Sequence, residues 1–212
     1  MRAPSDTAQR AIFVEQIQAL LRGAMYDEHL LVYVDEAHLH QDAELGYGWL
    51  VRGQRLWVCS SSPGLSKQVS CYGLYLYNEG QVEIWPYPRA NGDYSIDLLE
   101  RLRARCPDRP LKLIWDGASY HRSAKVCQRA AELNIDLIRL PAYSPDFMPV
   151  EALWRWLREE VTYHRCHNTG EELIAHIEQF RQTINAHPYD VADRLWVKDQ
   201  LDPEEEKLRI SQ

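Results

Sequence analysis

Residues 111–140 read LKLIWDGASYHRSAKVCQRAAELNIDLIRL. The stretch opens with a short apolar run at 111–115 and closes with another at 135–140, and both have the length of a buried strand. Between them, residues 123–133 have apolar positions at helical spacing. The stretch therefore predicts a strand, a helix and a second strand in succession, with Asp116 directly after the first strand.

Upstream, the apolar run LLVYV at 30–34 predicts another buried strand, which ends at Asp35. Strand-like segments separated by turn-forming residues follow it, and they favour an antiparallel meander. These segments are 48–51, 56–59, 69–77 and 82–85. Helical spacing marks residues 7–26, 94–105, 150–162 and 170–186. A meander followed by alternating strands and helices predicts an α/β protein with a mixed sheet.

Length and composition exclude several classes of protein. The chain has 212 residues, of which 45% are hydrophobic and 26% are charged, so we expect one globular domain or one domain with an appendage. No apolar run approaches the ~20 residues of a membrane helix. The N-terminus lacks the apolar core of a secretion signal, and the five cysteines form no CxxC pair. We therefore expect a cytoplasmic protein with reduced thiols.

The net charge of −7 argues against general binding to nucleic acid. However, residues 101–130 contain eight basic and two acidic side chains between two acidic flanks. The block is equally compatible with a solvated helix face and with a track for phosphates.

Three acidic residues occupy positions from which they can converge. Asp35 and Asp116 follow strands, and Glu151 falls in the first turn of a helix that Pro149 begins. Each could also be an ordinary turn, capping or helix-dipole residue. Together, three carboxylates would repel and raise one another's pKa unless cations neutralised them. Two divalent metals about 4 Å apart do this in phosphoryl transfer.

Three segments resemble the signature blocks of bacterial Tc/mariner-like insertion-sequence transposases, which belong to the DDE superfamily. They are Val34–Glu36, Trp115–His121 and Leu140–Glu151, the last with the characteristic Tyr143-Ser144-Pro145 loop. The resemblance spans about residues 30–170. It implies a ribonuclease-H-like fold with a mixed five-stranded sheet flanked by helices. We accordingly expect an N-terminal helix or linker at 1–28, a catalytic domain at 29–186 and a tail at 187–212.

The resemblance also implies an activity. Asp35, Asp116 and Glu151 match the acidic triad, which holds two Mg²⁺ ions, with Mn²⁺ as a substitute. The reaction is cleavage of transposon ends by water, followed by attack of the freed 3′ hydroxyl on target DNA. The expected partners are DNA and a second copy of the chain, at the nucleoid of a bacterial cell.

The chain departs from the family pattern at three places. Gly117 and Met148 stand where the family usually has asparagine. Fewer than 30 residues precede the first catalytic strand, too few for the family's helix-turn-helix domains, so a separate subunit or reading frame would supply DNA recognition. A catalytically idle remnant that binds DNA or dimerises is the alternative. A nuclease for RNA–DNA hybrids is a third reading, which the Tyr-Ser-Pro loop disfavours.

Other residues near the triad receive weaker predictions. Glu36, His121, Tyr143 and Ser144 are expected to lie behind the acids. His121 is expected to contact a phosphate or orient a water, and it could equally be a capping or surface residue. Arg122, Lys125 and Arg129 are candidates for DNA-backbone contacts. The run His164-Arg165-Cys166-His167 suggests zinc, but it lacks a second ligand pair, so we reject a zinc site. The tryptophans are expected to be packing residues.

Overall fold

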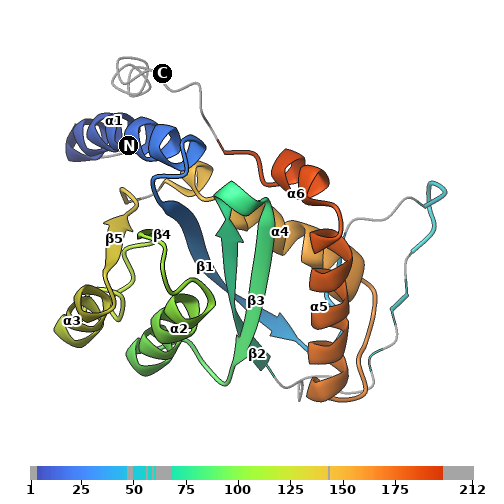
Figure 1. The fold of residues 1–212 in the computed structure, drawn as a ribbon. Coiled ribbons are helices and arrows are strands. Elements are labelled where there is room, and N and C mark those ends of the chain that lie inside the picture. Colours follow the sequence, from blue (N-terminus) through green and yellow to red (C-terminus); the bar gives the residue numbers. More distant parts are fainter. Residues whose placement is uncertain are drawn as a thin grey trace.

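The computed structural model describes residues 4–46, 50–55, 57–58, 60, 68–142 and 144–197. Five strands form one sheet in the order β3-β2-β1-β4-β5 (Figure 1). β1 pairs in parallel with β4, and β4 with β5, whereas β2 and β3 are antiparallel. The strands are β1 (Leu30–His40), β2 (Gln68–Leu76), β3 (Gln81–Tyr87), β4 (Leu111–Trp115) and β5 (Ile135–Arg139). The prediction of a mixed five-stranded sheet is confirmed.

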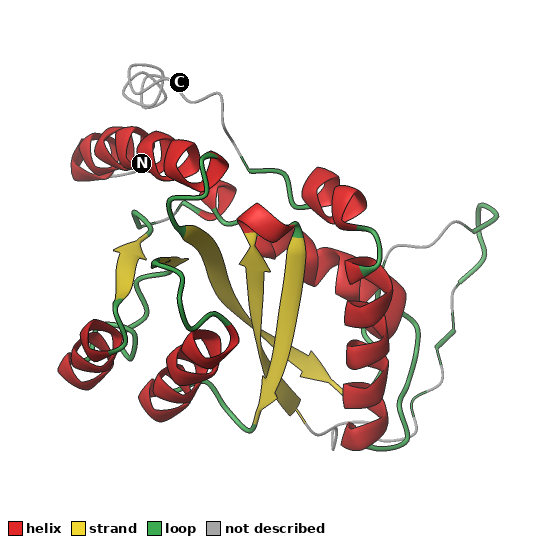
Figure 2. Cartoon of the chain, viewed as in Figure 1, coloured by secondary structure: helices red, strands yellow, loops and turns green. Residues whose placement is uncertain are grey.

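Helices cover both faces of this sheet (Figure 2). They are α1 (Pro4–Met25), α2 (Gly92–Arg105), α3 (Ala124–Glu132), α4 (Val150–Leu157), α5 (Gly170–Asn185) and α6 (Pro188–Arg194), and α4 continues into a π-helical turn, Arg158–Thr162. Side chains of a strand alternate between faces. Leu31 and Tyr33 of β1 accordingly join the apolar cluster under α1, α4, α5 and α6, whereas Val32 and Val34 join the one under α2 and α3.

β1 is longer than the apolar run predicts, because it continues through Asp35 to His40. Its antiparallel pairing with β2 extends to the pair His40↔Gln68, whereas its parallel pairing with β4 ends at Tyr33↔Ile114. Asp35 therefore lies inside a strand, at the point where β1 and β4 separate. This corrects the prediction that the strand ends at Asp35.

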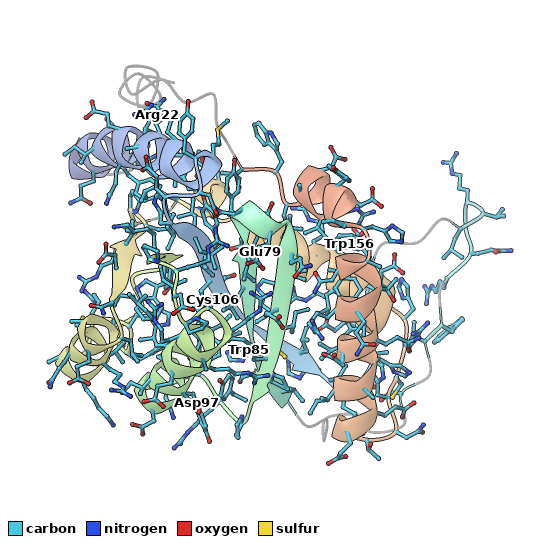
Figure 3. All side chains as sticks on the ribbon, in the orientation of Figure 1. Arg22, Glu79, Trp85, Asp97, Cys106 and Trp156 are labelled. Carbon is cyan, nitrogen blue, oxygen red and sulfur yellow. The ribbon has the colours of Figure 1, made fainter. Side chains whose placement is uncertain are left out.

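Two other predictions about the sheet and core need correction. The described residues of the expected strands 48–51 and 56–59, namely 50, 51, 57 and 58, are not in strands, and the rest of those segments lies outside the described residues. Trp57 is 83% exposed and Trp196 is 61% exposed, so neither is a core residue. By contrast, the ring of Trp156 packs edge-on against Phe180 of α5 with centroids 5.6 Å apart (Figure 3).

The first and last described helices share the main apolar cluster. Phe13 and Ile17 of α1 are buried there, as is Val191 of α6, which lies within the segment expected to be a tail. The domain limits at 28 and 186 remain predictions, and Glu204–Glu206 of the tail lie outside the described residues. Within the described part of the chain, no helix is both long and apolar enough to cross a membrane.

Candidate active site

Asp35, Asp116 and Glu151 line one cleft of about 810 Å³. They come from three elements: β1, the end of β4 and the first turn of α4. Residues of α1, among them Gln9 and Gln16, line the same cleft. The structure thus brings the three predicted acids to one cavity and adds a wall from the N-terminal helix, which the sequence patterns did not indicate.

The position of Asp35 in the cleft raises the pKa of its carboxyl group. Burial, and after it the nearby carboxylates of Glu151 and Glu36, raise the pKa of Asp35 to about 7. The indole of Trp154 donates a hydrogen bond from Nε1 to Asp35 Oδ2 at 3.1 Å, which partly opposes the rise. In the absence of a cation, protonated and ionised Asp35 are therefore both populated near neutral pH.

Gly73 allows α4 to approach the sheet beneath Asp35. Gly73 in β2 is the register partner of Asp35. A Cβ atom at Gly73 would lie 2.6 Å from Cζ2 of Trp154 and 3.0 Å from Cγ1 of Val150, distances that real Cβ atoms do not tolerate. The absence of a side chain at Gly73 therefore sets how closely the helix that carries Glu151 packs against β2.

Asp116 is held by a different set of contacts. Its Oδ1 accepts hydrogen bonds from the backbone N–H of Ala118 and from Nδ1 of His121, both at 2.9 Å. The His121 bond lowers the pKa of Asp116 most strongly. The expectation that all three acids have raised pKa values is therefore wrong for Asp116, because a histidine faces it instead of another acid.

His121 is buried and lies between two carboxylates. Its ring stacks on Trp115 with centroids 4.1 Å apart, and its Nε2 is 2.9 Å from Oε1 of Glu36. Burial lowers the pKa of His121, but Asp116 and Glu36 outweigh burial and raise that pKa to about 9. Although the metal-binding atoms of Glu36, Asp116 and His121 lie within 4.8 Å of one another, the imidazolium already occupies the place of a cation there.

The loop before Glu151 is fastened by α1. Arg10 is 3% exposed, and its Nη1 donates to Ser144 Oγ at 2.7 Å. The same guanidinium forms a two-pronged pair with Asp146, with N···O distances of 3.0 and 2.8 Å, and covers the ring of Phe147. Ser144 therefore supports the loop through Arg10, and in the described part of the chain its hydroxyl forms no hydrogen bond with an acid of the triad. Tyr143 lies outside the described residues.

The basic block is largely neutralised within the protein. Lys125 pairs with Asp93, and Arg129 pairs with Glu100 and Glu132. Arg103 caps backbone carbonyls, and Arg105 pairs with Glu79 and Glu83. Arg122, the third predicted DNA contact, lines the cleft instead. Arg139 lines the cleft as well, and it was not predicted because it lies nine residues beyond the basic block at 101–130.

The departures from the family pattern also lie at the cleft. Gly117 and Met148 both line it. A Cβ at Gly117 would meet no atom within 4 Å, so the space for a larger side chain is present. Met148 is buried, at 4% exposure, and fills its position with an apolar side chain.

Residues 30–174 match the family described as DDE superfamily endonuclease, and the match covers more than half of the chain. The chain belongs to this family. As a DDE endonuclease it is 28% identical over 164 residues to the insertion element IS630 uncharacterized 39 kDa protein of Shigella sonnei. The alignment covers 76% of this chain and 47% of that protein, so the chain spans about half the length of the curated relative it matches.

Solved structures of similar fold are transposases. The catalytic domain of Mos1 mariner transposase has a TM-score of 0.59 and 15% identity, with 92% of each chain covered. A Mos1 transposase paired-end complex with the left transposon end has a TM-score of 0.72 and 14% identity, covering 100% of this chain and 63% of that chain. The chain therefore has the ribonuclease-H-like fold of transposase catalytic domains, as the sequence predicts.

The donors at the cleft of this DDE endonuclease fit hard divalent cations. Carboxylate oxygens are the ligands that Mg²⁺ and Mn²⁺ prefer. Both hydrogen bonds to Asp116 end on Oδ1, so neither uses Oδ2. The raised pKa of Asp35 reflects burial first and the negative charge of Glu151 and Glu36 second, and a bound cation would neutralise that charge.

Proposed function

We propose that this chain is the catalytic domain of a transposase that cleaves DNA at transposon ends and joins them to target DNA. The observation that carries the proposal is the convergence of Asp35, Asp116 and Glu151 on one open cleft, in the order and spacing of a DDE triad. The fold of transposase catalytic domains supports it.

In this proposal Asp35, Asp116 and Glu151 hold two Mg²⁺ ions, or Mn²⁺ in their place. When bound, the two ions activate the attacking oxygen and stabilise the leaving oxygen at phosphorus. Asp35 must lose its proton to serve as a ligand, whereas Asp116 is already kept ionised and oriented by His121. Arg122 and Arg139 at the cleft bind phosphates of the DNA backbone.

The proposed partners follow from the same chemistry. DNA is the substrate, and two copies of the chain act together so that two transposon ends are processed. Because the chain spans about half of its curated relative, a separate subunit or segment supplies recognition of the end sequences. The complex works at the nucleoid in the cytoplasm of a bacterial cell.

A nicking assay on DNA that carries the transposon ends, with Mg²⁺ and any partner protein that reads those ends, tests the proposal. Asp116→Asn and Glu151→Gln should lose at least a hundredfold in rate, because each removes a ligand charge with little change in volume. Asp108→Asn and Glu160→Gln, which change exposed carboxylates outside the cleft, are the matched controls.

Circular dichroism should show that all four variants are folded. Equal nicking by folded wild type and Asp116→Asn would refute the assignment. A folded wild type with no Mg²⁺-dependent cleavage or joining, under conditions in which it binds the DNA, would favour the idle remnant.

A further inference from the structure

A second group of metal-binding side chains lies at the start of α5, outside the cleft. The metal-binding atoms of His167, Glu172 and His176 all lie within 4.8 Å of one another. His167 belongs to the segment before α5, whereas Glu172 and His176 lie one turn apart on the helix itself. The run 164–167 lacks a second pair of zinc ligands in the sequence, and Glu172 and His176 of α5 supply such a pair in the fold.

His167 is oriented as a ligand would be. It is 0% exposed, and its Nε2 is 3.1 Å from the backbone carbonyl oxygen of Val161. Because a carbonyl oxygen only accepts, Nε2 carries the proton, and in the neutral ring Nδ1 carries a lone pair. Histidines that bind metals commonly donate their other ring N–H to a carbonyl in this way.

His176 presents its own Nδ1 to the same point. The Nδ1 atoms of His167 and His176 are 3.1 Å apart. Two nitrogens that share a tetrahedral Zn²⁺ at 2.0–2.1 Å lie about 3.3 Å from each other. The two rings therefore need only a small adjustment to accept one ion between them.

Glu172 brings the negative charge. The backbone and side-chain nitrogens of Asn168 both bond to Oε2 of Glu172, at 2.7 and 3.0 Å, and these bonds do not use Oε1. Capping accounts for the Asn168 contacts and for Thr169. The two histidine nitrogens lie at hydrogen-bond distance in the absence of an ion, which is also close to the separation that a shared ion requires.

We propose that His167 Nδ1, His176 Nδ1 and a carboxylate oxygen of Glu172 bind one Zn²⁺ ion, with water as the fourth ligand. Two histidines and one carboxylate form a ligand set that zinc uses in proteins. The ion would join α5 to the segment that follows α4. That segment is also tied to the end of β1, since the N–H of His167 donates to the carbonyl of Gln41 at 2.9 Å and Gln41 Nε2 donates to Asn168 O at 2.8 Å. The proposal is independent of the proposed function.

The test uses the full chain, freed of metals with a chelator and then titrated with Co²⁺ in the presence of excess Mg²⁺, which competes for the carboxylate cleft. Wild type should bind one equivalent of Co²⁺ with the visible absorption of four-coordinate cobalt, and Zn²⁺ should displace it. Because no thiol is among the proposed ligands, the near-ultraviolet band of a cobalt–thiolate bond should be absent.

Variants separate this site from the others. His176→Gln and Glu172→Gln should weaken Co²⁺ binding at least tenfold, with the fold checked by circular dichroism. Asp116→Asn in the cleft and His187→Gln, an exposed histidine before α6, should bind Co²⁺ as wild type does. Zn²⁺ should raise the melting temperature of wild type and His187→Gln but not that of His176→Gln.

Three outcomes would overturn the proposal. They are the absence of four-coordinate Co²⁺ in folded wild type, its retention in His176→Gln, and its loss in Asp116→Asn. Because the readout is spectroscopic, failure of the nuclease assay has no bearing on it.

Discussion

Asp35 and Asp116 have the same side chain and line the same cleft, yet their pKa values move in opposite directions. Asp35 is buried beside Glu151 and Glu36, so its ionised form is disfavoured. Asp116 accepts a hydrogen bond from a histidine whose pKa is raised to about 9, so its ionised form is favoured. At the scale of the residue, the partner of each acid decides its protonation before any metal binds.

The stability of the metal-free protein should depend on pH because of the raised pKa of Asp35. The pKa of Asp35 is about 7 in the folded chain and near 3.8 when unfolded, so between those values the folded state binds more protons. The free energy of unfolding should therefore fall as pH rises through this window, by at most about 4 kcal/mol from this residue. Asp35→Asn should flatten that slope and raise the melting temperature at pH 8 in chelator.

Asp116→Asn should have the opposite effect and lower the metal-free melting temperature at pH 8, because it removes the anion that faces the His121 imidazolium. Thermal melts of both variants from pH 4 to 8, with Asp108→Asn as the control, provide the measurement. A steeper pH dependence in Asp35→Asn than in wild type would contradict the pKa assigned to Asp35.

Gly73→Ala should lower both the stability of the protein and its affinity for metal, although it replaces none of the three acids. The added methyl group would lie 2.6 Å from the indole of Trp154, so α4 or the ring must move. Overpacking of this kind costs about 1–3 kcal/mol. We also expect a lower affinity for Mn²⁺, because Glu151 lies on the displaced helix.

Gly170→Ala is the matched control for Gly73→Ala, since a Cβ at Gly170 meets nothing within 4 Å. Urea unfolding gives the stability of each variant, and calorimetric titration gives its Mn²⁺ affinity. Unchanged values for both quantities in Gly73→Ala would show that the close approach of α4 does not position the site.

At the scale of the element, α1 and the loop before α4 act as one unit. Arg10 bonds to both Ser144 and Asp146, and Phe13 packs against Phe147 with ring centroids 5.3 Å apart. An arginine this deeply buried is stable only because its charge is matched. The helix therefore fixes the segment that leads into Glu151.

Arg10→Met keeps much of the side-chain volume but leaves Asp146 without this partner. We expect a loss of stability on the order of 2 kcal/mol, less than for a fully buried pair because the Asp146 side chain is 29% exposed. Hydrogen exchange should become faster at residues 144–151. Arg22→Met, on the exposed side of the same helix (Figure 3), should change neither quantity. If hydrogen exchange in Arg10→Met became faster only within α1, the prediction that α1 fixes the loop before α4 would be wrong.

At the scale of the whole molecule, the charges available to DNA differ from those counted along the chain. Arg122 and Arg139 line the cleft, whereas Lys125 and Arg129 pair with acids on the surface of α2 and α3. Each lysine or arginine that neutralises a phosphate contributes about 0.9 to the slope of log binding constant against log salt concentration. The cleft residues should therefore dominate the salt dependence.

Replacing both Arg122 and Arg139 by alanine should reduce that slope by nearly 2 and weaken binding equally for specific and scrambled duplexes. Replacing both Lys125 and Arg129 by alanine should reduce it by less, because these side chains are already paired with acids and do not line the cleft. Fluorescence anisotropy at several salt concentrations measures both. A larger change in the second double variant would indicate that the DNA follows α3 instead of the cleft.

Much of this molecule could be predicted from the sequence because its signals are local. Apolar runs mark β1, β4 and β5, and helical spacing marks α2 to α5. The continuation of β1 beyond Asp35 could not be predicted, because residues 35–40 are strand only through their pairing with β2. The contacts of Arg10 with Ser144 and of His167 with His176 likewise join residues whose proximity depends on the completed fold.

Because of α1, the segment that matches the family is shorter than the segment that folds as one unit. The family match begins at residue 30, after the helix has ended. A fragment cut at that boundary would lose one wall of the cleft and the arginine that fastens its loop, and it would expose the apolar surface that Phe13 and Ile17 cover. Shortened versions of this chain should therefore retain the N-terminal helix, although none of the three acids of the cleft lies within it.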